Sequence, residues 1–266
     1  MEPVLFGFGL HTVVRGKWIK RLTLYLFARF VETPLLKITF WATQSESPFS
    51  RSKLLKTLAK ATVARLMSKL DTGVPTPLER ALEIVEMQDG PIAVGPCRCR
   101  SAHRACSHPL ETDIVIRHGT QAFKRAFPKD YRIISKEEAK AILQTCRRER
   151  MFHMVFVHCP AHDLEEYVVC NCCTDGCVPY LANRFFGQDG FSLIKGEYEA
   201  YVERDVCRLC GECVDACPWD ARRIANGRLY INADSCMGCG LCKIVCPTGA
   251  ARIKRVRTID WAALAG

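Results

Sequence analysis

The fold is decided by two runs of sequence, C-R-L-C-G-E-C-V-D-A-C-P at residues 207–218 and C-M-G-C-G-L-C-K-I-V-C-P at residues 236–247. Each follows the pattern Cys-x2-Cys-x2-Cys-x3-Cys-Pro, and the second run begins 29 residues after the first. A short loop with the first three cysteines can place three thiolates on three irons of a cubane cluster, but it cannot curl back to the fourth iron. The fourth ligand must therefore come from another segment.

This spacing predicts the ligands of two [4Fe-4S] clusters. In runs of this kind the fourth cysteine binds the other cluster. One cluster is expected on Cys207, Cys210, Cys213 and Cys246, and the other on Cys236, Cys239, Cys242 and Cys217. Two four-thiolate zinc sites are the alternative, since they also use Cys-x2-Cys pairs. A zinc site needs neither a third cysteine at the next Cys-x2-Cys spacing nor a fourth cysteine from the other run, so iron–sulfur clusters are favoured over zinc.

The residues between the ligands fit the same chemistry. Gly211 and Gly240 occupy equivalent places, where the absent side chain lets backbone N–H groups approach the cluster sulfurs. Between the runs, R-I-A-N-G-R-L-Y-I predicts a hairpin that turns at Asn226 and Gly227. At these residues the chain resembles the bacterial two-cluster ferredoxins. The resemblance implies a pseudo-twofold fold of two short hairpins and two helical turns, which transfers single electrons between redox partners.

The cysteine content of the whole chain indicates metal binding rather than disulfides. The 266 residues include 17 cysteines, an odd number, and the first residues lack the charge order of a secretory leader. We therefore expect a reducing, cytoplasmic compartment, where clustered cysteines are more often metal ligands. No apolar run is long enough to predict a membrane span. No dinucleotide or phosphate-loop motif is present, so flavin or nicotinamide is expected only on a partner.

A second, less specific cysteine-rich region precedes the two runs. It contains G-P-C-R-C-R-S-A-H-R-A-C at residues 95–106 and V-V-C-N-C-C-T-D-G-C at residues 168–177. The candidate ligands of a third centre are Cys97, Cys99, Cys106, Cys170, Cys172, Cys173 and Cys177. Thiols at such short spacings cannot all point at one ion, which favours a polynuclear cluster over zinc; a reactive thiol site is the third hypothesis. Arg98, Arg100 and Arg104 are expected to offset the negative charge of a cluster.

From about residue 77 to residue 257 the chain is similar to ferredoxin-like 4Fe-4S binding proteins of anaerobes. Those proteins carry an upstream Cys-x-Cys-Arg segment, a later Cys-Asn-Cys-Cys segment and then the two-cluster domain. The resemblance implies electron transfer in anaerobic metabolism and little more. A common version of the later segment has more closely spaced cysteines, whereas residues 174–176 here separate Cys173 from Cys177. The ligand subset of the third centre therefore stays open.

Local patterns predict several elements in this first region. A helix is expected at L-E-R-A-L-E-I-V-E-M, residues 78–87, with Thr76 as its N-cap. Another should begin after Ser135 and end near Cys146, which we expect to be a buried structural thiol. The stretch M-F-H-M-V-F-V-H-C, residues 151–159, predicts a buried strand. A loop at the end of this strand, with a spacing compatible with metal binding, contains His158, Cys159 and His162.

The N-terminal arm is basic and amphipathic. Residues 1–70 hold twelve Lys or Arg against three acids, which is +9 of the formal +10 of the chain. Cations are interspersed with aromatic residues at positions 16–31 and with leucines at positions 53–70, as in two basic helices. Such helices lie on a membrane surface, dock on a redox partner or cover the core of their own protein. Nucleic-acid binding is not expected, because no reading motif accompanies the cations.

Together these patterns predict an α+β protein. We expect a basic helical arm at 1–70, a cysteine-rich α/β module at 71–200, a two-cluster ferredoxin domain at 201–257 and a tail at 258–266. The expected function is iron–sulfur electron transfer, as a carrier or as a subunit of an oxidoreductase complex, in the cytoplasm or on the cytoplasmic face of a membrane. An enzyme whose first cysteine region is catalytic and a redox sensor are the alternatives.

Overall fold

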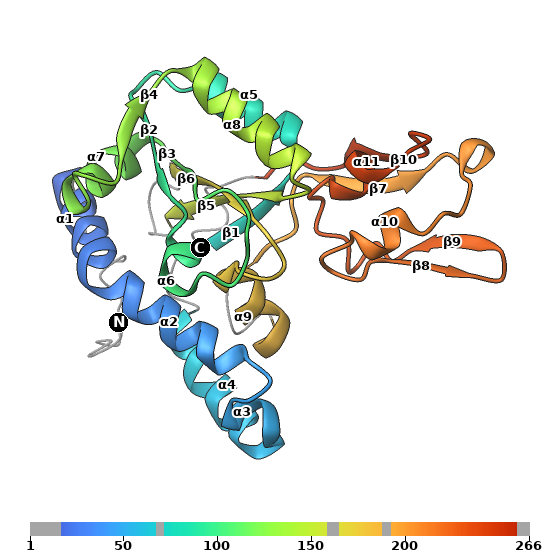
Figure 1. Cartoon of the computed structure of the whole chain (residues 1–266), viewed down its shortest axis with the longest axis horizontal. Helices are drawn as coiled ribbons and strands as arrows, with labels where there is room; N and C mark the ends of the chain where they lie inside the picture. Colours follow the sequence, from blue (N-terminus) through green and yellow to red (C-terminus); the bar gives the residue numbers. More distant parts are fainter. Residues whose placement is uncertain (1–16, 68–71, 159–164, 188–192, 260–266) are drawn as a thin grey trace, which may run out of the picture.

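The computed structural model describes residues 17–67, 72–158, 165–187 and 193–259, which form helices and antiparallel sheets (Figure 1). The predicted α+β class is therefore confirmed. No helix within these residues is both long and apolar enough to cross a membrane.

A six-stranded antiparallel sheet lies at the centre, with the strand order β1-β5-β6-β3-β2-β4. Its strands are β1 (Thr72–Thr76), β2 (Ile92–Pro96), β3 (Glu111–Val115), β4 (Arg132–Ile134), β5 (Phe152–His158) and β6 (Glu165–Cys172). The predicted buried strand is confirmed as β5. Phe152 and Met154 join the core on one face and Val155 and Val157 the core on the other, because side chains alternate along a strand.

Two helices cover the second of these faces, α5 (Leu78–Glu86) and α8 (Lys136–Arg148). The predicted cap of α8 is confirmed, since the Ser135 hydroxyl accepts a hydrogen bond from the Glu138 N–H at 3.1 Å. Cys146 is buried near the end of α8, as expected. The N-cap prediction for α5 was wrong. Pro77 caps that helix, while Thr76 ends β1 and its hydroxyl donates to the Val74 carbonyl.

The opposite face is covered by α7 (Arg117–Ala126), by the short α6 (Arg98–His103), by α9 (Val178–Phe186) and by the N-terminal α1 (Lys17–Leu26). Leu24 and Ala28 are buried in one core cluster with Phe123 and Phe156. The Arg125 guanidinium lies 5.2 Å from the ring centre of Tyr25. This part of the arm therefore covers the protein's own core, which was one of the three interpretations of its sequence.

The arm runs on as one long helix rather than ending at residue 31. After α1 come a π-helical turn at Phe27–Val31 and then α2 (Glu32–Thr43). Pro34 has no N–H to donate to Phe30, and the Glu32 N–H bonds five residues back to the Phe27 carbonyl, so the ladder is widened just before the proline. The short α3 (Pro48–Arg51) and α4 (Lys53–Met67) complete the described arm, and the predicted second basic helix is confirmed as α4 over these residues.

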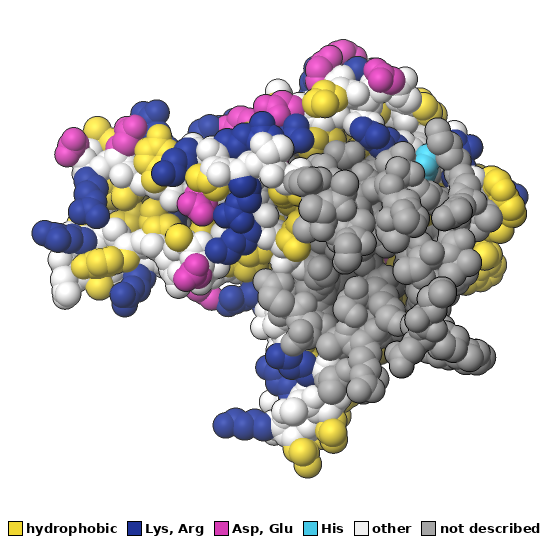
Figure 2. Space-filling view, turned by 180° about the vertical axis from the view of Figure 1, so that it is seen from behind, with side chains coloured by type: hydrophobic (Ala, Val, Ile, Leu, Met, Phe, Trp, Pro, Cys, Tyr) yellow, Lys and Arg dark blue, Asp and Glu magenta, His cyan; other side chains and the backbone are white. Residues whose placement is uncertain are grey.

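The C-terminal elements form a separate lobe at the side of the sheet (Figure 1). They are β7 (Tyr198–Val202), a 3-10 turn (Arg204–Val206), α10 (Glu212–Asp215), β8 (Arg222–Ala225), β9 (Arg228–Ile231), α11 (Leu241–Val245) and β10 (Ala251–Arg255). β7 pairs with β10, and β8 pairs with β9. The predicted hairpin is confirmed, with φ of 48° at Asn226 and 66° at Gly227 in its turn. On the face seen in Figure 2, cationic, acidic and hydrophobic side chains are interspersed over this lobe.

Candidate metal centres

Two cavities in the C-terminal lobe are lined by cysteines. The first, of about 20 Å³, is surrounded by Cys207, Cys210, Cys213 and Cys246. The second, also of about 20 Å³, is surrounded by Cys217, Cys236, Cys239 and Cys242. Each cavity thus takes three cysteines from one run and the fourth from the other run.

Backbone N–H groups point at the sulfurs of both groups. The Ala251 N–H lies 3.3 Å from the Cys246 sulfur and the Ala221 N–H lies 3.3 Å from the Cys217 sulfur. Burial raises the pKa of Cys246, but the N–H of Ala251 and the hydroxyl of Thr248 outweigh it, and the net shift of this pKa is downward. These donors favour the thiolate, which is the form that binds metals.

The two predicted glycines allow the loops to close around the cavities. Gly211 and Gly240 have φ of 87° and 74° and stand directly before α10 and α11. A β-carbon on Gly240 would lie 2.9 Å from the Cβ of Pro77. Only glycine adopts this conformation at low cost. The N–H of Leu241, in the first turn of α11, donates to the Cys239 sulfur.

A buried arginine that the sequence analysis did not select lies between the two groups. Arg222, 4% exposed, borders the second cavity and donates from Nη1 to the Cys213 sulfur of the first at 3.4 Å. Its Nη2 atom is buried and has no hydrogen-bond partner among the described residues. A guanidinium placed in this way suits a negatively charged group beside it. Two arginines open β8, directly after the first run, and nothing in the sequence alone tells which of them turns inward.

The first cysteine-rich region encloses a third and larger cavity, of about 100 Å³. The thiols that line it, named here the inner group, belong to Cys97, Cys99, Cys170, Cys172 and Cys177. Cys97 and Cys99 lie at the start of α6, and Cys177 stands at the N-terminus of α9. Cys170 and Cys172 are two residues apart on β6 and so face the same side of the sheet.

The thiols of the inner group contact one another in a continuous chain. Cys97 contacts Cys99, Cys99 contacts Cys177, Cys177 contacts Cys172, and Cys172 contacts Cys170. Burial raises the pKa of Cys177, but hydrogen bonds from Cys172, Cys99 and the Tyr180 N–H lower this pKa to about 6. The hydrogen bond with the neighbouring Cys99, together with burial, raises the pKa of Cys97 well above its usual range. The hydrogen bonds to Cys177 favour its thiolate form.

Arg100 supplies positive charge beside the inner group. It is 2% exposed, and its guanidinium donates to the carbonyls of Asn171 (2.9 Å) and Pro109 (2.8 Å). Its Nε atom is buried without a partner among the described residues. Of the three arginines selected from the sequence, Arg100 is the one buried beside the inner group. Arg98 lines the cavity, but its guanidinium binds Glu32 at 2.9 Å, and Arg104 is an exposed residue at the end of α6.

Two of the seven predicted thiols lie outside the inner group. Cys106 and Cys173 do not line the cavity, and their sulfurs lie 3.4 Å from each other. The ligand subset that the sequence left open is therefore divided in the structure into a group of five thiols and a separate pair. Side chains alternate where β6 ends, so the adjacent Cys172 and Cys173 point to opposite sides. Cys159 and His162 lie outside the described residues, and only the backbone of His158 is described.

The N-terminal arm forms one wall of the larger cavity. Phe27, Glu32, Leu35, Leu36 and Thr39 line it from the side opposite β6. The Glu32–Arg98 ion pair holds the start of α2 against α6, and the Phe40 ring stacks on His103 with centroids 3.7 Å apart. The contact joins segments about 65 residues apart, so the local sequence pattern does not reveal this role.

The inner group and the second cavity of the C-terminal lobe lie on either side of one aromatic contact. The Tyr180 hydroxyl donates to the Pro218 carbonyl at 2.6 Å, one residue beyond Cys217. The Trp219 ring packs edge to face against Tyr180, at 5.7 Å, and Phe152, at 5.3 Å. Tyr180 also donates its backbone N–H to Cys177, so one residue contacts both cysteine-rich regions.

The comparisons with known proteins concern the C-terminal lobe. Residues 206–250 match the family described as 4Fe-4S dicluster domain. A search of curated proteins found no match to the chain. The chain thus contains an iron–sulfur, ferredoxin-like module with a general electron-transfer role, and the match supports at least one [4Fe-4S] cluster.

Proposed function

We propose that this protein transfers single electrons between redox partners through two [4Fe-4S] clusters in residues 201–257. One cluster is held by Cys207, Cys210, Cys213 and Cys246, and the other by Cys236, Cys239, Cys242 and Cys217. The observation that carries the proposal is the composition of the two cavities, each of which combines three thiols of one run with the fourth thiol of the other.

The alternative of two zinc sites fits this geometry less well. A single zinc ion needs its ligand atoms within about 4 Å of one another. Among the described residues, one group has three ligand atoms of His, Cys, Asp or Glu within 4.8 Å of one another, and this group does not line either of these two cavities. The eight cysteines therefore surround spaces instead of converging on points.

The residues around the cavities suit this function. A [4Fe-4S] cluster, when bound, accepts and releases one electron at a time. The N–H groups of Ala221 and Ala251 face the Cys217 and Cys246 sulfurs, and Arg222 contributes a buried positive charge. Each of these groups stabilises added negative charge and so raises the reduction potential.

A third metal centre in the inner group is the second part of the proposal. Five thiols around one cavity, with the buried Arg100 beside them, form a donor set for an iron–sulfur cluster. The Tyr180 contact links this set to the lobe, as expected of a protein in which electrons pass between the two regions.

An enzyme is the competing hypothesis, and one observation favours it. A cubane uses four thiolates, whereas the inner group has five, and the pKa of Cys177 is lowered to about 6 by its donors. A fifth thiol leaves one sulfur for substrate chemistry in a cavity of about 100 Å³. Full occupation of the inner group by a stable cluster, with no thiol open to alkylation in the folded protein, would argue for the carrier.

The arm is the proposed docking element for a redox complex or the cytoplasmic face of a membrane. Large apolar side chains on it are strongly exposed, among them Trp18 (68%), Phe30 (63%), Ile38 (63%) and Leu54 (69%). Lysines and arginines are interspersed with them along the sequence, which is typical of segments that meet anionic lipids or acidic proteins. Co-sedimentation with anionic vesicles at low and high salt distinguishes a membrane from a protein partner. If the chain binds the vesicles at neither salt concentration, the membrane is excluded as the partner.

The decisive experiment is anaerobic iron and zinc analysis of the purified chain, with spin quantitation after reduction. Two clusters predict about eight irons and three predict about twelve. The variant Cys97→Ser should lose the iron of the third centre and keep about eight. Fewer than about eight irons in the native chain, with zinc well above one per chain, would overturn the assignment of the ferredoxin cysteines.

A further inference from the structure

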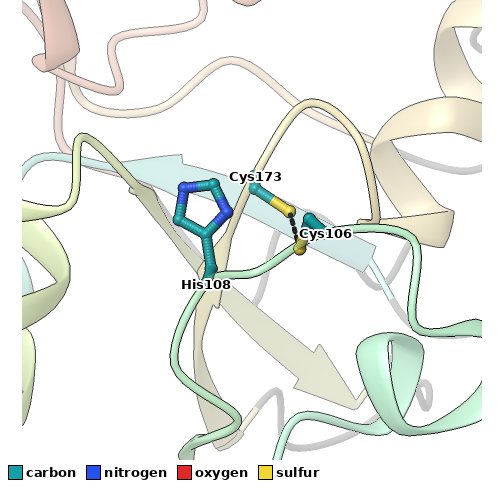
Figure 3. Close-up of side chains that lie close together, drawn as sticks. All are labelled: Cys106, His108 and Cys173. Atoms are coloured by element: carbon teal, nitrogen blue, oxygen red, sulfur yellow. Dashed lines mark hydrogen bonds between the residues drawn. The ribbon is translucent and has the colours of Figure 1, made fainter.

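A third set of ligands lies beside the inner group but outside its cavity. Cys106, His108 and Cys173 place their ligand atoms within 4.8 Å of one another. Figure 3 shows the two sulfurs facing each other with the His108 ring beside them. His108 was not selected from the sequence, because the Cys-x-His pair Cys106 and His108 gains its companion Cys173, the residue after β6, only in the folded chain.

We propose that Cys106, His108 and Cys173 bind one zinc ion, at a site separate from the iron–sulfur centres. Two thiolates and one imidazole are ligands that zinc prefers. The proposal does not rest on the proposed electron transfer, since none of the three residues lines the cavity of the inner group or those of the lobe.

The distances suit a single ion. Two thiolates bound to one zinc at about 2.3 Å in tetrahedral geometry lie about 3.8 Å apart. The two sulfurs here are 3.4 Å apart, so a shift of a few tenths of an ångström is enough to admit the metal. A disulfide would require a much larger approach, to about 2.05 Å.

The surroundings of the three side chains also point to a metal. The Nδ1 atom of His108 is buried and has no hydrogen-bond partner among the described residues. A buried ring nitrogen without a partner is costly, and coordination removes this cost. Arg100 lies close enough to Cys173 to donate to its sulfur. Cys106 and His108 are only half-buried, which leaves the ion a path of entry.

The number of ligands indicates the kind of site. The described residues supply three protein ligands, and no fourth His, Cys, Asp or Glu joins them. Structural zinc has four protein ligands, whereas three protein ligands and one exchangeable position are typical of reactive zinc. The fourth position would take water or a small anionic or thiol ligand.

Metal analysis of a set of variants tests the site. The anaerobically purified full chain is incubated with an equimolar amount of Zn²⁺ and desalted, and zinc and iron are then measured. The native chain should retain about one zinc, with two sulfurs at about 2.3 Å and the remaining ligands at about 2.0–2.2 Å by X-ray absorption. The variants Cys106→Ser, Cys173→Ser and His108→Ala should each lose most of the zinc and none of the iron.

Matched controls keep the result specific. Cys97→Ser, in the inner group, and Cys146→Ser, a buried thiol in neither group, should keep the zinc. His108→Cys should restore it, because a third thiolate replaces the imidazole. The site is refuted if the native chain holds no zinc, if zinc survives in Cys106→Ser and His108→Ala, or if it disappears in Cys97→Ser. A disulfide between Cys106 and Cys173 in the anaerobic protein, detected by mass spectrometry, would refute it as well.

Discussion

The hydroxyl of Tyr180 donates a hydrogen bond of 2.6 Å to the carbonyl of Pro218 and thereby joins α9 to the residue that follows Cys217. Both partners are buried or nearly so, and the Trp219 ring shields the bond. A bond in this position fixes the C-terminal lobe against the cysteine-rich sheet.

Replacing this tyrosine should loosen that junction. Tyr180→Phe leaves the Pro218 carbonyl without its donor, at a cost of about 1–3 kcal/mol. For a chain of this size each kcal/mol lowers the midpoint of thermal unfolding by about 2–4 °C. Anaerobic circular dichroism measures the midpoint, with Tyr201→Phe, a more exposed tyrosine of the same lobe, as the control. Equal midpoints in the two variants would contradict the role given to the bond.

The crossed ligand sets make an unusual prediction for double variants. Cys217→Ser with Cys242→Ser damages one proposed cluster twice, so about four irons should be lost. Cys213→Ser with Cys217→Ser damages both clusters, so about eight should be lost, although both cysteines belong to the same run. Iron analysis and spin counting decide between the pairings. The reverse order of losses would show that each run serves its own cluster.

Arg222 should raise the reduction potential of the lobe. The variant Arg222→Gln removes a buried positive charge 3.4 Å from the Cys213 sulfur, and the potential should fall by tens of millivolts. The reduction potential of the variant Arg222→Lys should fall less, because lysine keeps the positive charge. The matched control is Arg223→Gln, since the neighbouring Arg223 is exposed. Potentiometric titration followed by electron paramagnetic resonance measures the shift, and equal potentials in the Arg222→Gln and Arg223→Gln variants would contradict the assignment.

Acid should destabilise the sheet through His153. This side chain is 1% exposed and its Nδ1 lies 2.7 Å from Asn171 Oδ1, and burial lowers the pKa of His153 to about 4. Below its ordinary pKa of about 6.5 the unfolded chain binds a proton that the folded chain does not, so stability falls as the pH drops from about 6.5 to 4. The expected loss is about 3 kcal/mol.

The same measurement in His153→Gln isolates that contribution. Glutamine can keep the contact with Asn171 without titrating, so the midpoint of thermal unfolding should depend less on pH between 6.5 and 4. The comparison is made anaerobically over this pH range. An equal pH dependence in the native and variant chains would mean that other groups cause the acid sensitivity.

Sequence alone predicted the features that depend on neighbouring residues. The Asn226-Gly227 hairpin, the Ser135 cap and the strand at β5 follow from local preference and side-chain alternation, and all three are present. The cap at Thr76 failed because tertiary pairing extended β1 to that residue. The dicluster match covers only residues 206–250, the part with the most regular spacing.

The features missed by the sequence analysis depend on long-range packing. The division of the seven thiols into five and two depends on where the fold places the four segments that carry them. The inward position of Arg222 and the contact of Tyr180 with Pro218 require the finished fold. The cover that the arm provides over the larger cavity was invisible for the same reason, because its basic amphipathic pattern fits a membrane, a partner or the core equally well.

The helix α2 carries two surfaces at once. Leu35 and Leu36 face the cavity of the inner group, while Ile38 and Trp41, one turn further on, are exposed at 63% and 53%. A surface that binds the outer side of α2 is therefore separated from the cavity of the inner group by this one helix. If the group bound in the cavity shifts α2, it must change the affinity of the protein for the surface that binds α2. By reciprocal linkage, binding of that surface then changes the equilibrium of the group in the cavity by the same factor.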